Sequence, residues 1–297
     1  MIMMNQPVDT LLTATPSLVR PEVSPERPLD SIERANLSLA RLTELVELAE
    51  MVHTADPYDV EPLAFKLPAD FKLSIVIPVY NEERTIREIL ARVAALPLPK
   101  EIVVVDDCSR DRTPELLREL ASASELKVVF KSQNEGKGAA LRTGFEHATG
   151  TIVVVQDADL EYDPRDILAL LPPLLRNEAD VVYGSRFLHE QPHDKSFVHR
   201  LGNWSLTTAS NLFTGLRITD METCYKAFRR DVIQGLPIRQ NRFGFEPEVT
   251  AKLARRKCRV LEVPISYNAR SFAEGKKIGL KDLFNALWCI VRYGIAD

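Results

Sequence analysis

The chain has 297 residues, of which 45% are hydrophobic and 27% charged, which excludes a disordered chain and leaves room for a folded core. A formal net charge of −4 does not support wholesale nucleic-acid binding, and we expect no nucleic-acid partner. The four cysteines are widely scattered, without a CxxC pair or a zinc-ligand spacing, which predicts reduced thiols in a cytoplasmic protein.

Residues 1–70 are predicted to form a flexible tail followed by one amphipathic helix. Prolines recur over residues 1–28, which lack hydrophobic periodicity and the pattern of a secretory signal. Spacings of three and four then predict a helix over residues 30–52, with the apolar residues Ile32, Ala35, Leu39, Leu42 and Val46 on one face. Packing on the main domain and dimerisation both remain open for this helix.

An α/β domain is predicted over residues 71–279. Short β-branched runs predict strands at 73–79, 101–106, 126–131, 151–157 and 180–184. Helical patterns lie between them, at 82–95, 113–123, 137–148 and 164–176. Continuously apolar strands are buried on both faces, so we expect a mostly parallel, Rossmann-like sheet flanked by helices. Ligands bind beyond the carboxyl ends of the strands in such sheets.

Acidic residues follow three of these strands. Glu82 comes after the first and Asp107 after the second, while Asp157, Asp159 and Glu161 follow the fourth. Carboxylates gathered at one sheet edge repel one another unless a cation or a hydrogen-bonded ligand compensates them. Because Asp157 and Asp159 are two residues apart at a strand end, they can converge on Mg²⁺ or Mn²⁺, with Glu161 as a third ligand.

A glycine-rich segment, NEGKGAALRTGFEHATG, covers residues 134–150. The start of its helix and Lys137 would favour a nearby phosphate, whereas a glycine turn with close packing on the sheet is the structural alternative. The segment is not a P-loop, and the first strand is not followed by a GxGxxG turn. These absences argue against a nicotinamide dehydrogenase.

Several ordered motifs resemble the family 2 inverting glycosyltransferases of GT-A fold, and within them the polyprenyl-phosphate sugar synthases such as dolichyl-phosphate mannosyltransferase. The matching stretches are IVIPVYNEE (75–83), VVVDDCSRD (103–111), NEGKGAALRTGF (134–145), QDADLEYDP (156–164), YGSRF (183–187) and VPISYNAR (263–270). Together they extend over about residues 72–281. The resemblance implies an enzyme of GT-A fold that transfers a hexose.

The resemblance also implies roles for individual residues. The base and ribose of the donor would contact Pro78, Tyr80, Glu82, Val105 and Asp107. The diphosphate would lie against Asp157, Ala158 and Asp159, with Asp159 and Glu161 as metal ligands and Asp157 close by. Phosphate of the donor or acceptor would face Arg186, and a mobile loop would bring Arg270 with Lys276 or Lys277 over the diphosphate.

The implied reaction is metal-dependent, inverting transfer of a hexose from GDP-mannose or UDP-glucose to a polyprenyl phosphate. An acceptor phosphate is already an anion near neutral pH, so the reaction has little need of a general base. Asp220 is the candidate should a base act or the acceptor need orienting, and a turn or cap aspartate is its structural alternative. Transfer to a sugar hydroxyl and a noncatalytic nucleotide-sugar binding module remain alternatives.

Two further segments suggest contacts with the acceptor. His189, His193 and His199 have spacings of four and six without a nearby cysteine, so an anion-holding loop that includes Arg200 is favoured over a metal site. Residues 280–297 predict an amphipathic helix. It would cover a core, pair with another subunit in a homo-oligomer, or lie on the cytoplasmic face of a membrane.

Overall fold

The computed structural model describes residues 63, 65–123, 126–188, 197–269 and 280–295. All of them belong to one compact unit, 57–297. The predicted tail and the helix over residues 30–52 lie outside the described residues. So do His189, His193, Arg270, Lys276 and Lys277.

The described residues form a seven-stranded sheet in the order β3-β2-β1-β4-β6-β5-β7. Its strands are β1 (Leu73–Val79), β2 (Lys100–Asp106), β3 (Lys127–Phe130), β4 (Ile152–Val155), β5 (Val181–Ser185), β6 (Lys226–Arg229) and β7 (Val260–Pro264). Strand β6 is antiparallel to both of its neighbours, β4 and β5, and the other pairs are parallel. The expected mostly parallel sheet is therefore confirmed, and β6 and β7 are added to the predicted strands.

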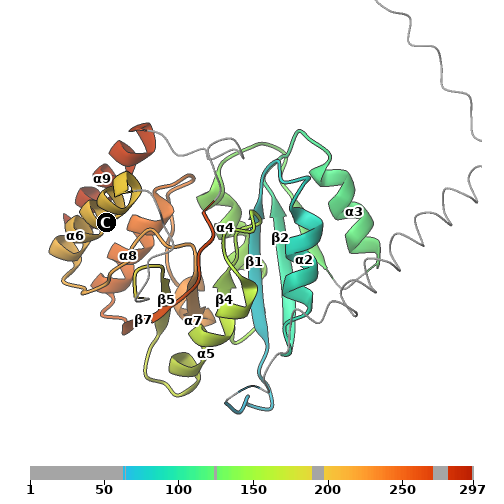
Figure 1. The fold of residues 1–297 in the computed structure, drawn as a ribbon, viewed down its shortest axis with the longest axis horizontal. Helices are drawn as coiled ribbons and strands as arrows, with labels where there is room; N and C mark the ends of the chain where they lie inside the picture. The colour runs from blue at the N-terminus through green and yellow to red at the C-terminus, as the bar shows by residue number, and fades with distance from the viewer. Residues whose placement is uncertain (1–62, 64, 124–125, 189–196, 270–279, 296–297) are drawn as a thin grey trace, which may run out of the picture. The chain divides into compact units, whose positions relative to one another are not determined.

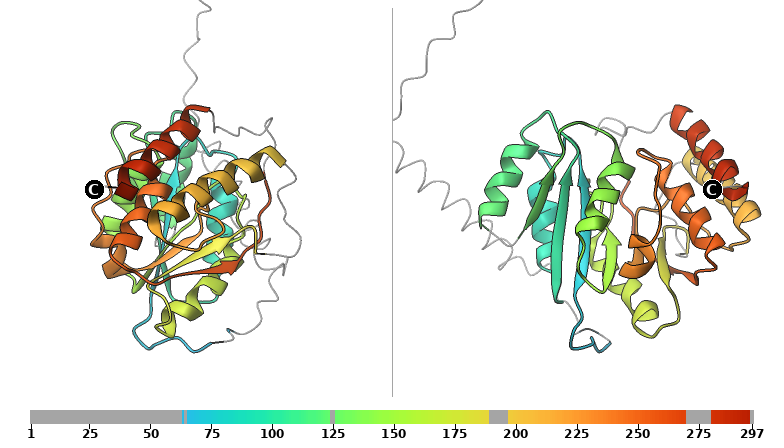
Figure 2. Two further views of the ribbon diagram at one scale, coloured as in Figure 1. Left: turned by 90° about the vertical axis from the view of Figure 1, so that its left-hand side faces the viewer. Right: turned by 180° about the vertical axis from the view of Figure 1, so that it is seen from behind.

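Helices flank this sheet (Figure 1). They are α2 (Ile86–Ala94), α3 (Thr113–Ala123), α4 (Lys137–His147), α5 (Ile167–Leu175) after the 3₁₀ turn η1 (Pro164–Asp166), α6 (Phe197–Thr214), α7 (Arg230–Gln234), α8 (Phe245–Arg255) and α9 (Leu280–Ile295). Helices α6, α8 and α9 pack on one another at one end of the sheet, and α3 lies at the other end, beside β3 (Figures 1 and 2). Among the described helices, none has the length and apolarity to cross a bilayer.

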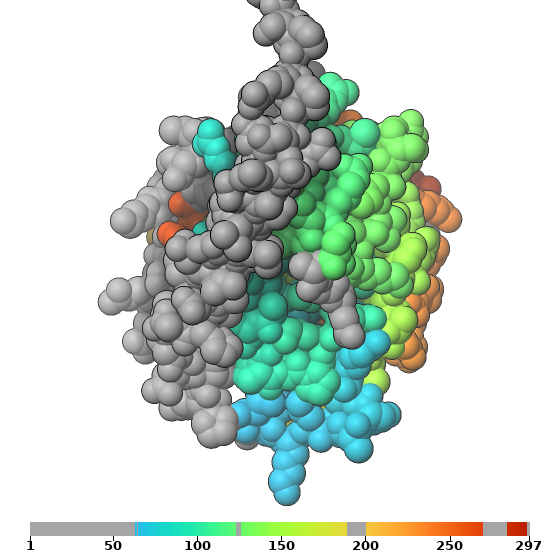
Figure 3. Space-filling model, turned by 90° about the vertical axis from the view of Figure 1, so that its right-hand side faces the viewer, coloured from blue at the N-terminus to red at the C-terminus, as the bar shows by residue number. Residues whose placement is uncertain are grey.

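The side opposite to α6 and α9 is built from early elements. Among the described residues visible in Figure 3, the colours on this side run from blue through green to yellow-green, with the orange and red of later elements only at the edges. The two ends of the sheet are therefore formed by different parts of the sequence.

The core lies where the strands carry β-branched residues on both faces. Val76 and Val104 are fully buried in β1 and β2, and the parallel register aligns Val79 with Asp106. Helix α4 approaches β1 at Gly144, where a Cβ atom would lie 2.3 Å from Cγ1 of Val76. Only glycine permits this approach, so the structural alternative for the glycine-rich segment is realised at this position. Because the register pairs Val79 with Asp106, the carboxyl ends of β1 and β2 lie at the same level.

Candidate active site

Sharp turns follow β1, β2 and β4 at the carboxyl edge of the sheet. Each turn contains a non-glycine residue with positive φ: Asn81 (56°), Cys108 (62°) and Leu160 (62°). Such residues are uncommon in proteins and cluster at ligand sites, where the surrounding structure enforces them. All three turns carry residues that the sequence had assigned to the donor site.

The turns after β1 and β2 are joined by hydrogen bonds between side chains and backbone. The Asn81 backbone N–H donates to Oγ of Ser109 at 2.9 Å, and the Arg110 N–H donates to Oδ1 of Asn81 at 2.8 Å. The Glu82 N–H donates to Oγ1 of Thr113 at 2.9 Å. These bonds fix the two turns as one unit, so the residues expected around the base and ribose occupy a rigid support.

Asp107 fastens the glycine loop to this support. Its carboxylate accepts the backbone N–H groups of Glu135 at 3.1 Å and Gly136 at 2.6 Å, and Nζ of Lys131 lies 3.4 Å away. Asp107 is only 2% exposed and Val105 is fully buried. Of the residues expected to meet the base and ribose, Pro78, Tyr80 and Glu82 are partly exposed, so a donor would reach those three more readily.

Lys137, at the first position of α4, lies between two carboxylates. Its Nζ is 2.9 Å from Oδ1 of Asp157 and 3.4 Å from Oε1 of Glu246, at the start of α8. Burial alone would lower the pKa of Lys137, but the charges of Asp157 and Glu246 and the hydrogen bond to Asp157 together outweigh burial and raise the pKa well above its ordinary value. The lysine that the sequence offered to a phosphate is therefore already bound to the first acid of the Asp-Ala-Asp turn.

The turn after β4 places Ala158, Asp159 and Glu161 close to the segment that follows β7. Ala158 is buried, and Oδ1 of Asp159 accepts the Glu161 N–H at 3.1 Å. Oε2 of Glu161 accepts the Tyr267 hydroxyl at 2.8 Å. Burial, and then the Glu161 charge, raise the pKa of Tyr267, so this phenol stays a donor.

The acids after β4 do not by themselves form a closed metal site. Within the described ranges, no three His, Cys, Asp or Glu side chains are grouped closely enough to hold an ion. Asp157 and Asp159 still supply hard oxygen donors from one turn, and Mg²⁺ commonly takes one or two carboxylates and completes its shell with phosphate oxygens and water. These residues therefore fit an ion that is bound together with a diphosphate.

Arg186 and Asp220 form a buried ion pair between the ends of β5 and β6. Nε and Nη2 of Arg186 lie 2.7 and 2.8 Å from the two Asp220 oxygens, and the Arg186 N–H also donates to Asp220 at 3.1 Å. Asp220 is fully buried. Burial would lower the pKa of Arg186, but Asp220 raises it, so the guanidinium keeps its charge.

Arg186 also contacts other side chains of the site. Its guanidinium lies over the Tyr267 ring, 5.0 Å from the centroid, and donates to Oδ1 of Asn203 in α6 at 3.4 Å. The side chain keeps 15% exposure. A fixed cation thus lies at the same edge as the acids that follow β4, where a phosphate would meet it.

Two carboxyl groups near this pair were not found from the sequence. Oε1 of Glu222 and Oε2 of Glu246 are buried without a hydrogen-bond partner in the structure. Burial, and then the charge of Glu246, raise the pKa of Glu222 to about 8. Isolated glutamates form no motif, and only their place inside apolar stretches, as in FGFEPEV, could have drawn attention to them.

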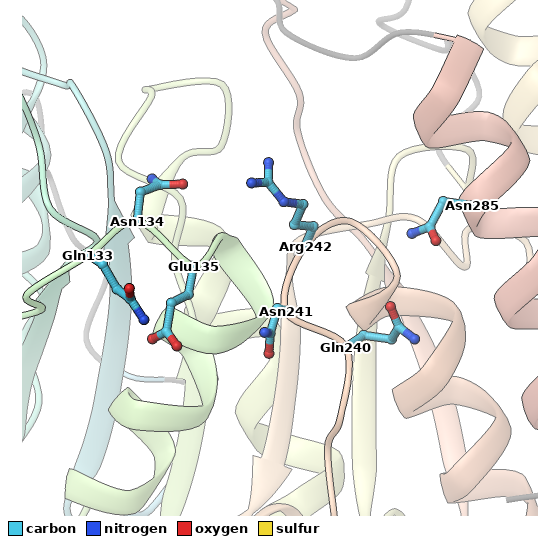
Figure 4. Close-up of a pocket in the computed structure, with 7 residues that line it drawn as sticks. All are labelled: Gln133, Asn134, Glu135, Gln240, Asn241, Arg242 and Asn285. Atoms are coloured by element: carbon cyan, nitrogen blue, oxygen red, sulfur yellow. The ribbon is translucent and has the colours of Figure 1, made fainter.

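A cavity of about 590 Å³ opens beside the glycine loop (Figure 4). It is lined by polar side chains from the loop before α4, the loop before α8 and helix α9, namely Gln133, Asn134, Glu135, Gln240, Asn241, Arg242 and Asn285. Among the described residues, none of those assigned to the donor or the metal lines it, and neither do Arg186 and Asp220. The loop before α8 is held close to α4, since a Cβ on Gly138 would lie 2.3 Å from the Gln240 carbonyl oxygen.

Residues 74–236 match the Glycosyl transferase family 2 profile. The chain belongs to this family. The dolichol-phosphate mannosyltransferase of Pyrococcus furiosus is 31% identical over 226 residues, which cover 74% of this chain and 63% of that protein. The undecaprenyl-phosphate 4-deoxy-4-formamido-L-arabinose transferase of Aeromonas hydrophila is 34% identical over 75% of this chain and 68% of that protein. The chain thus spans about two thirds of the length of these relatives.

Solved structures show the same fold. Glucosyl-3-phosphoglycerate synthase from Mycobacterium tuberculosis, crystallised with uridine diphosphate, aligns with a TM-score of 0.61 at 22% identity and covers 77% of this chain and 82% of that one. The GT-A fold that the sequence motifs implied is confirmed, as is membership of a glycosyltransferase family. Other crystals of the same synthase contain Mn²⁺ or Mg²⁺ with uridine diphosphate.

Proposed function

We propose that the chain transfers a hexose from a nucleotide sugar, GDP-mannose or UDP-glucose, to a polyprenyl phosphate with inversion at the anomeric carbon. An acceptor phosphate oxygen forms the new bond to that carbon as its bond to the donor diphosphate breaks, and the nucleoside diphosphate leaves. The proposal is supported by the relatives, which are named for dolichol phosphate and undecaprenyl phosphate. The relative from Pyrococcus furiosus is named a mannosyltransferase, which supports mannose as one candidate sugar.

The buried ion pair of Arg186 and Asp220 is the observation that favours a phosphate acceptor. A base acting on a sugar hydroxyl must reach the acceptor, yet Asp220 is fully buried and both its oxygens accept from Arg186. This arrangement suits an aspartate that orients a cation. We propose that Asp220 fixes Arg186, and that Arg186 holds a phosphate of the acceptor or donor.

The acids after β4 are proposed to hold the donor diphosphate together with Mg²⁺ or Mn²⁺. Asp159 and Glu161 are the proposed ligands, with Asp157 adjacent and Ala158 against the diphosphate. The ion, when bound, stabilises negative charge on the departing diphosphate. Lys137 neutralises Asp157 from the opposite side. Arg270 with Lys276 or Lys277 would cover the diphosphate from the loop that follows Asn268.

The donor side rests on the joined turns after β1 and β2. Pro78, Tyr80 and Glu82 are proposed to contact the base and ribose directly. Asp107 and Val105 would act from beneath, since Asp107 holds the glycine loop in place through two backbone N–H groups. We place the reaction at a membrane surface, because the proposed acceptor is a membrane lipid.

A transfer assay tests the proposal. Purified full-length chain would be incubated with Mg²⁺ or Mn²⁺, undecaprenyl phosphate or dolichyl phosphate, and a panel of donors labelled in the sugar. We expect label in the lipid extract, dependence on the divalent cation, and loss of labelling on addition of EDTA. The matched control replaces the lipid phosphate with the corresponding polyprenol, which has the same chain and no phosphate.

Two results would contradict the proposal. Equal labelling of the polyprenol would show that the acceptor group is a hydroxyl, which restores Asp220 as the candidate base. Tight binding of nucleotide sugars without transfer to any acceptor would favour a noncatalytic binding module.

A further inference from the structure

Several polar side chains of helix α6 point inward, and four of its large apolar side chains are exposed, although Leu206 is buried. On the inner side Asn203 contacts Arg186, Oγ1 of Thr207 accepts the Met221 N–H at 3.1 Å, and Asn211 bonds to both backbone groups of Ile218. The exposed large apolar residues of the helix are Leu201, Trp204, Leu212 and Phe213. A helix on the surface of a water-soluble domain normally has the opposite arrangement.

Helix α9 carries apolar residues both on its buried side and on its exposed side. Ala286, Cys289, Ile290 and Tyr293 are buried against the domain. The outward residues are also apolar, and the exposed ones are Phe284, Leu287, Trp288, Val291 and Ile295. A helix side that carries several large apolar residues is normally covered. Here Phe284 is 69% and Trp288 is 55% exposed.

The exposed apolar residues of α6 and α9 lie on two neighbouring helices. The two helices pack side by side (Figures 1 and 2). Near their carboxyl ends, a Cβ on Gly294 would lie 2.6 Å from Cβ of Phe213, so the helices touch there without a gap. We call this the α6/α9 face, defined by the exposed residues Leu201, Trp204, Leu212, Phe213, Phe284, Leu287, Trp288, Val291 and Ile295. Contiguous exposed apolar residues of this kind mark interaction sites.

Charge distinguishes between the partners that this face would fit. Helix α6 contains no Asp or Glu, and α9 contains one acidic residue, Asp282, near its start. The basic residues are Arg200, Lys281 and Arg292. Two copies meeting face to face would bring these cations together with little acidic charge to offset them. An anionic bilayer, by contrast, accepts Trp and Leu side chains at its apolar boundary and offers negatively charged headgroups to the arginines.

We propose that the α6/α9 face is the surface by which the chain binds a bilayer that contains anionic lipids. The apolar residues enter the boundary between headgroups and acyl chains, and Arg200 and Arg292 lie at the level of the headgroup phosphates. This inference rests on the proposed function only for its biological purpose, because the binding itself requires no donor and no turnover.

The face is mechanically joined to the candidate site through α6. Asn203 and Trp204 are neighbours in sequence, and the first touches Arg186 while the second is 64% exposed. One turn later, Thr207 holds the segment that carries Asp220. A bilayer bound at the outer row would therefore lie one helix thickness from the cation proposed to hold phosphate.

Vesicle flotation tests the proposal. The full-length chain would be mixed with vesicles of phosphatidylcholine alone or with phosphatidylglycerol added, and the floating fraction measured. We expect binding that increases with the anionic lipid and weakens with salt. The double variant Trp204→Glu with Trp288→Glu should bind at least about tenfold more weakly, because each substitution replaces an apolar anchor with a like charge for the lipid.

A matched control places the same new charge at the other end of the sheet. Phe130, in β3, is an exposed aromatic residue, so Phe130→Glu should leave flotation unchanged. Equal binding of the double variant and the wild type would overturn the proposal. So would a concentration-dependent dimer in sedimentation that the double variant loses while vesicles recruit neither protein, because that result assigns the face to a second copy.

The outcome is separable from the transfer assay. With a short-chain, water-soluble polyprenyl phosphate as acceptor, the double variant should retain the wild-type rate, since neither tryptophan lies in the site. Loss of flotation together with loss of that rate would indicate damage to the fold and would count against the proposal. Normal flotation in a protein that transfers no sugar would overturn the proposed function and leave the membrane-binding face standing.

Discussion

The two flanks of the site hold their carboxylates by different means. Beside β1 and β2, Asp107 accepts backbone N–H groups of Glu135 and Gly136. Beside β5 and β6, Asp220 accepts two guanidinium N–H groups of Arg186. Backbone donors are fixed by the fold, whereas a side-chain cation depends on its partner for position and charge. The first flank is therefore a support, and the second carries charges that a substrate can use.

The largest effect should come from breaking the pair on the second flank. Asp220→Asn leaves the Arg186 guanidinium with reduced charge compensation in a buried place, which should cost about 3–5 kcal/mol of unfolding free energy. Urea unfolding followed by circular dichroism would measure it. The control is Glu119→Gln, which breaks the exposed Arg87–Glu119 pair and should cost only about 0–1 kcal/mol. Equal costs for the two variants would remove the distinction between the flanks.

A second large effect is expected in the turn after β4. Asp159→Asn removes a charged oxygen donor that the proposed ion requires, so the rate of transfer should fall about 10²–10³-fold. Its unfolding free energy should change little, because the Asp159 side chain is partly exposed and an amide oxygen still accepts the Glu161 N–H. Initial rates of sugar transfer, measured over a range of Mg²⁺ and Mn²⁺ concentrations for both proteins, would measure this loss. Undiminished activity at every concentration would exclude Asp159 as a ligand.

The first flank was largely predictable from the sequence, whereas on the second flank β5, Arg186 and Asp220 were expected and strand β6 was not. The run LSIVIPV predicts β1 with its correct bounds, because a buried parallel strand reads as continuous β-branched residues. Strand β6 is only KAFR, and its first residue is a lysine. That lysine, Lys226, is fully buried. Its ammonium donates to the carbonyl oxygens of Met221 and Thr223 and lies 4.5 Å from the Tyr183 ring centroid, which compensates the buried charge. No local pattern reveals such compensation.

The same limit applies to individual site residues. The Asp-Ala-Asp turn was found because its acids directly follow an apolar strand. The ion pair between its first acid, Asp157, and Lys137 was not predicted. Lys137 is twenty residues away in sequence, and the pairing arises only when α4 packs on β1 and β2. Glu222 and Glu246 belong to separate elements and meet only through the fold. Sequence motifs locate the edge of the sheet, and tertiary packing decides which charges neutralise each other there.

A moderate effect is expected on the first flank. In Asp107→Asn, the amide cannot accept both backbone N–H groups, so one buried donor loses its partner at a cost of about 1–3 kcal/mol. The glycine loop should loosen, which faster hydrogen exchange at Glu135 and Gly136 would reveal. A variant as stable as the wild type, with unchanged exchange there, would show that the loop is held by its packing on the segment before α8 and not by Asp107.

The smallest effect, per pH unit, should appear at Glu222. Its folded-state pKa, raised to about 8 by burial and then by Glu246, exceeds the value of about 4.3 for an exposed glutamate. Between these values the folded chain keeps a proton that the unfolded chain releases, so this group makes stability fall as pH rises, by at most about 1.4 kcal/mol per unit. Glu222→Gln should remove that contribution. Unfolding free energies at pH 5, 6, 7 and 8 would then diverge progressively in favour of the variant. Parallel curves for the two proteins would mean that Glu222 is ionised in the folded chain, with its charge met by Lys226 or Arg186, as the second flank meets that of Asp220.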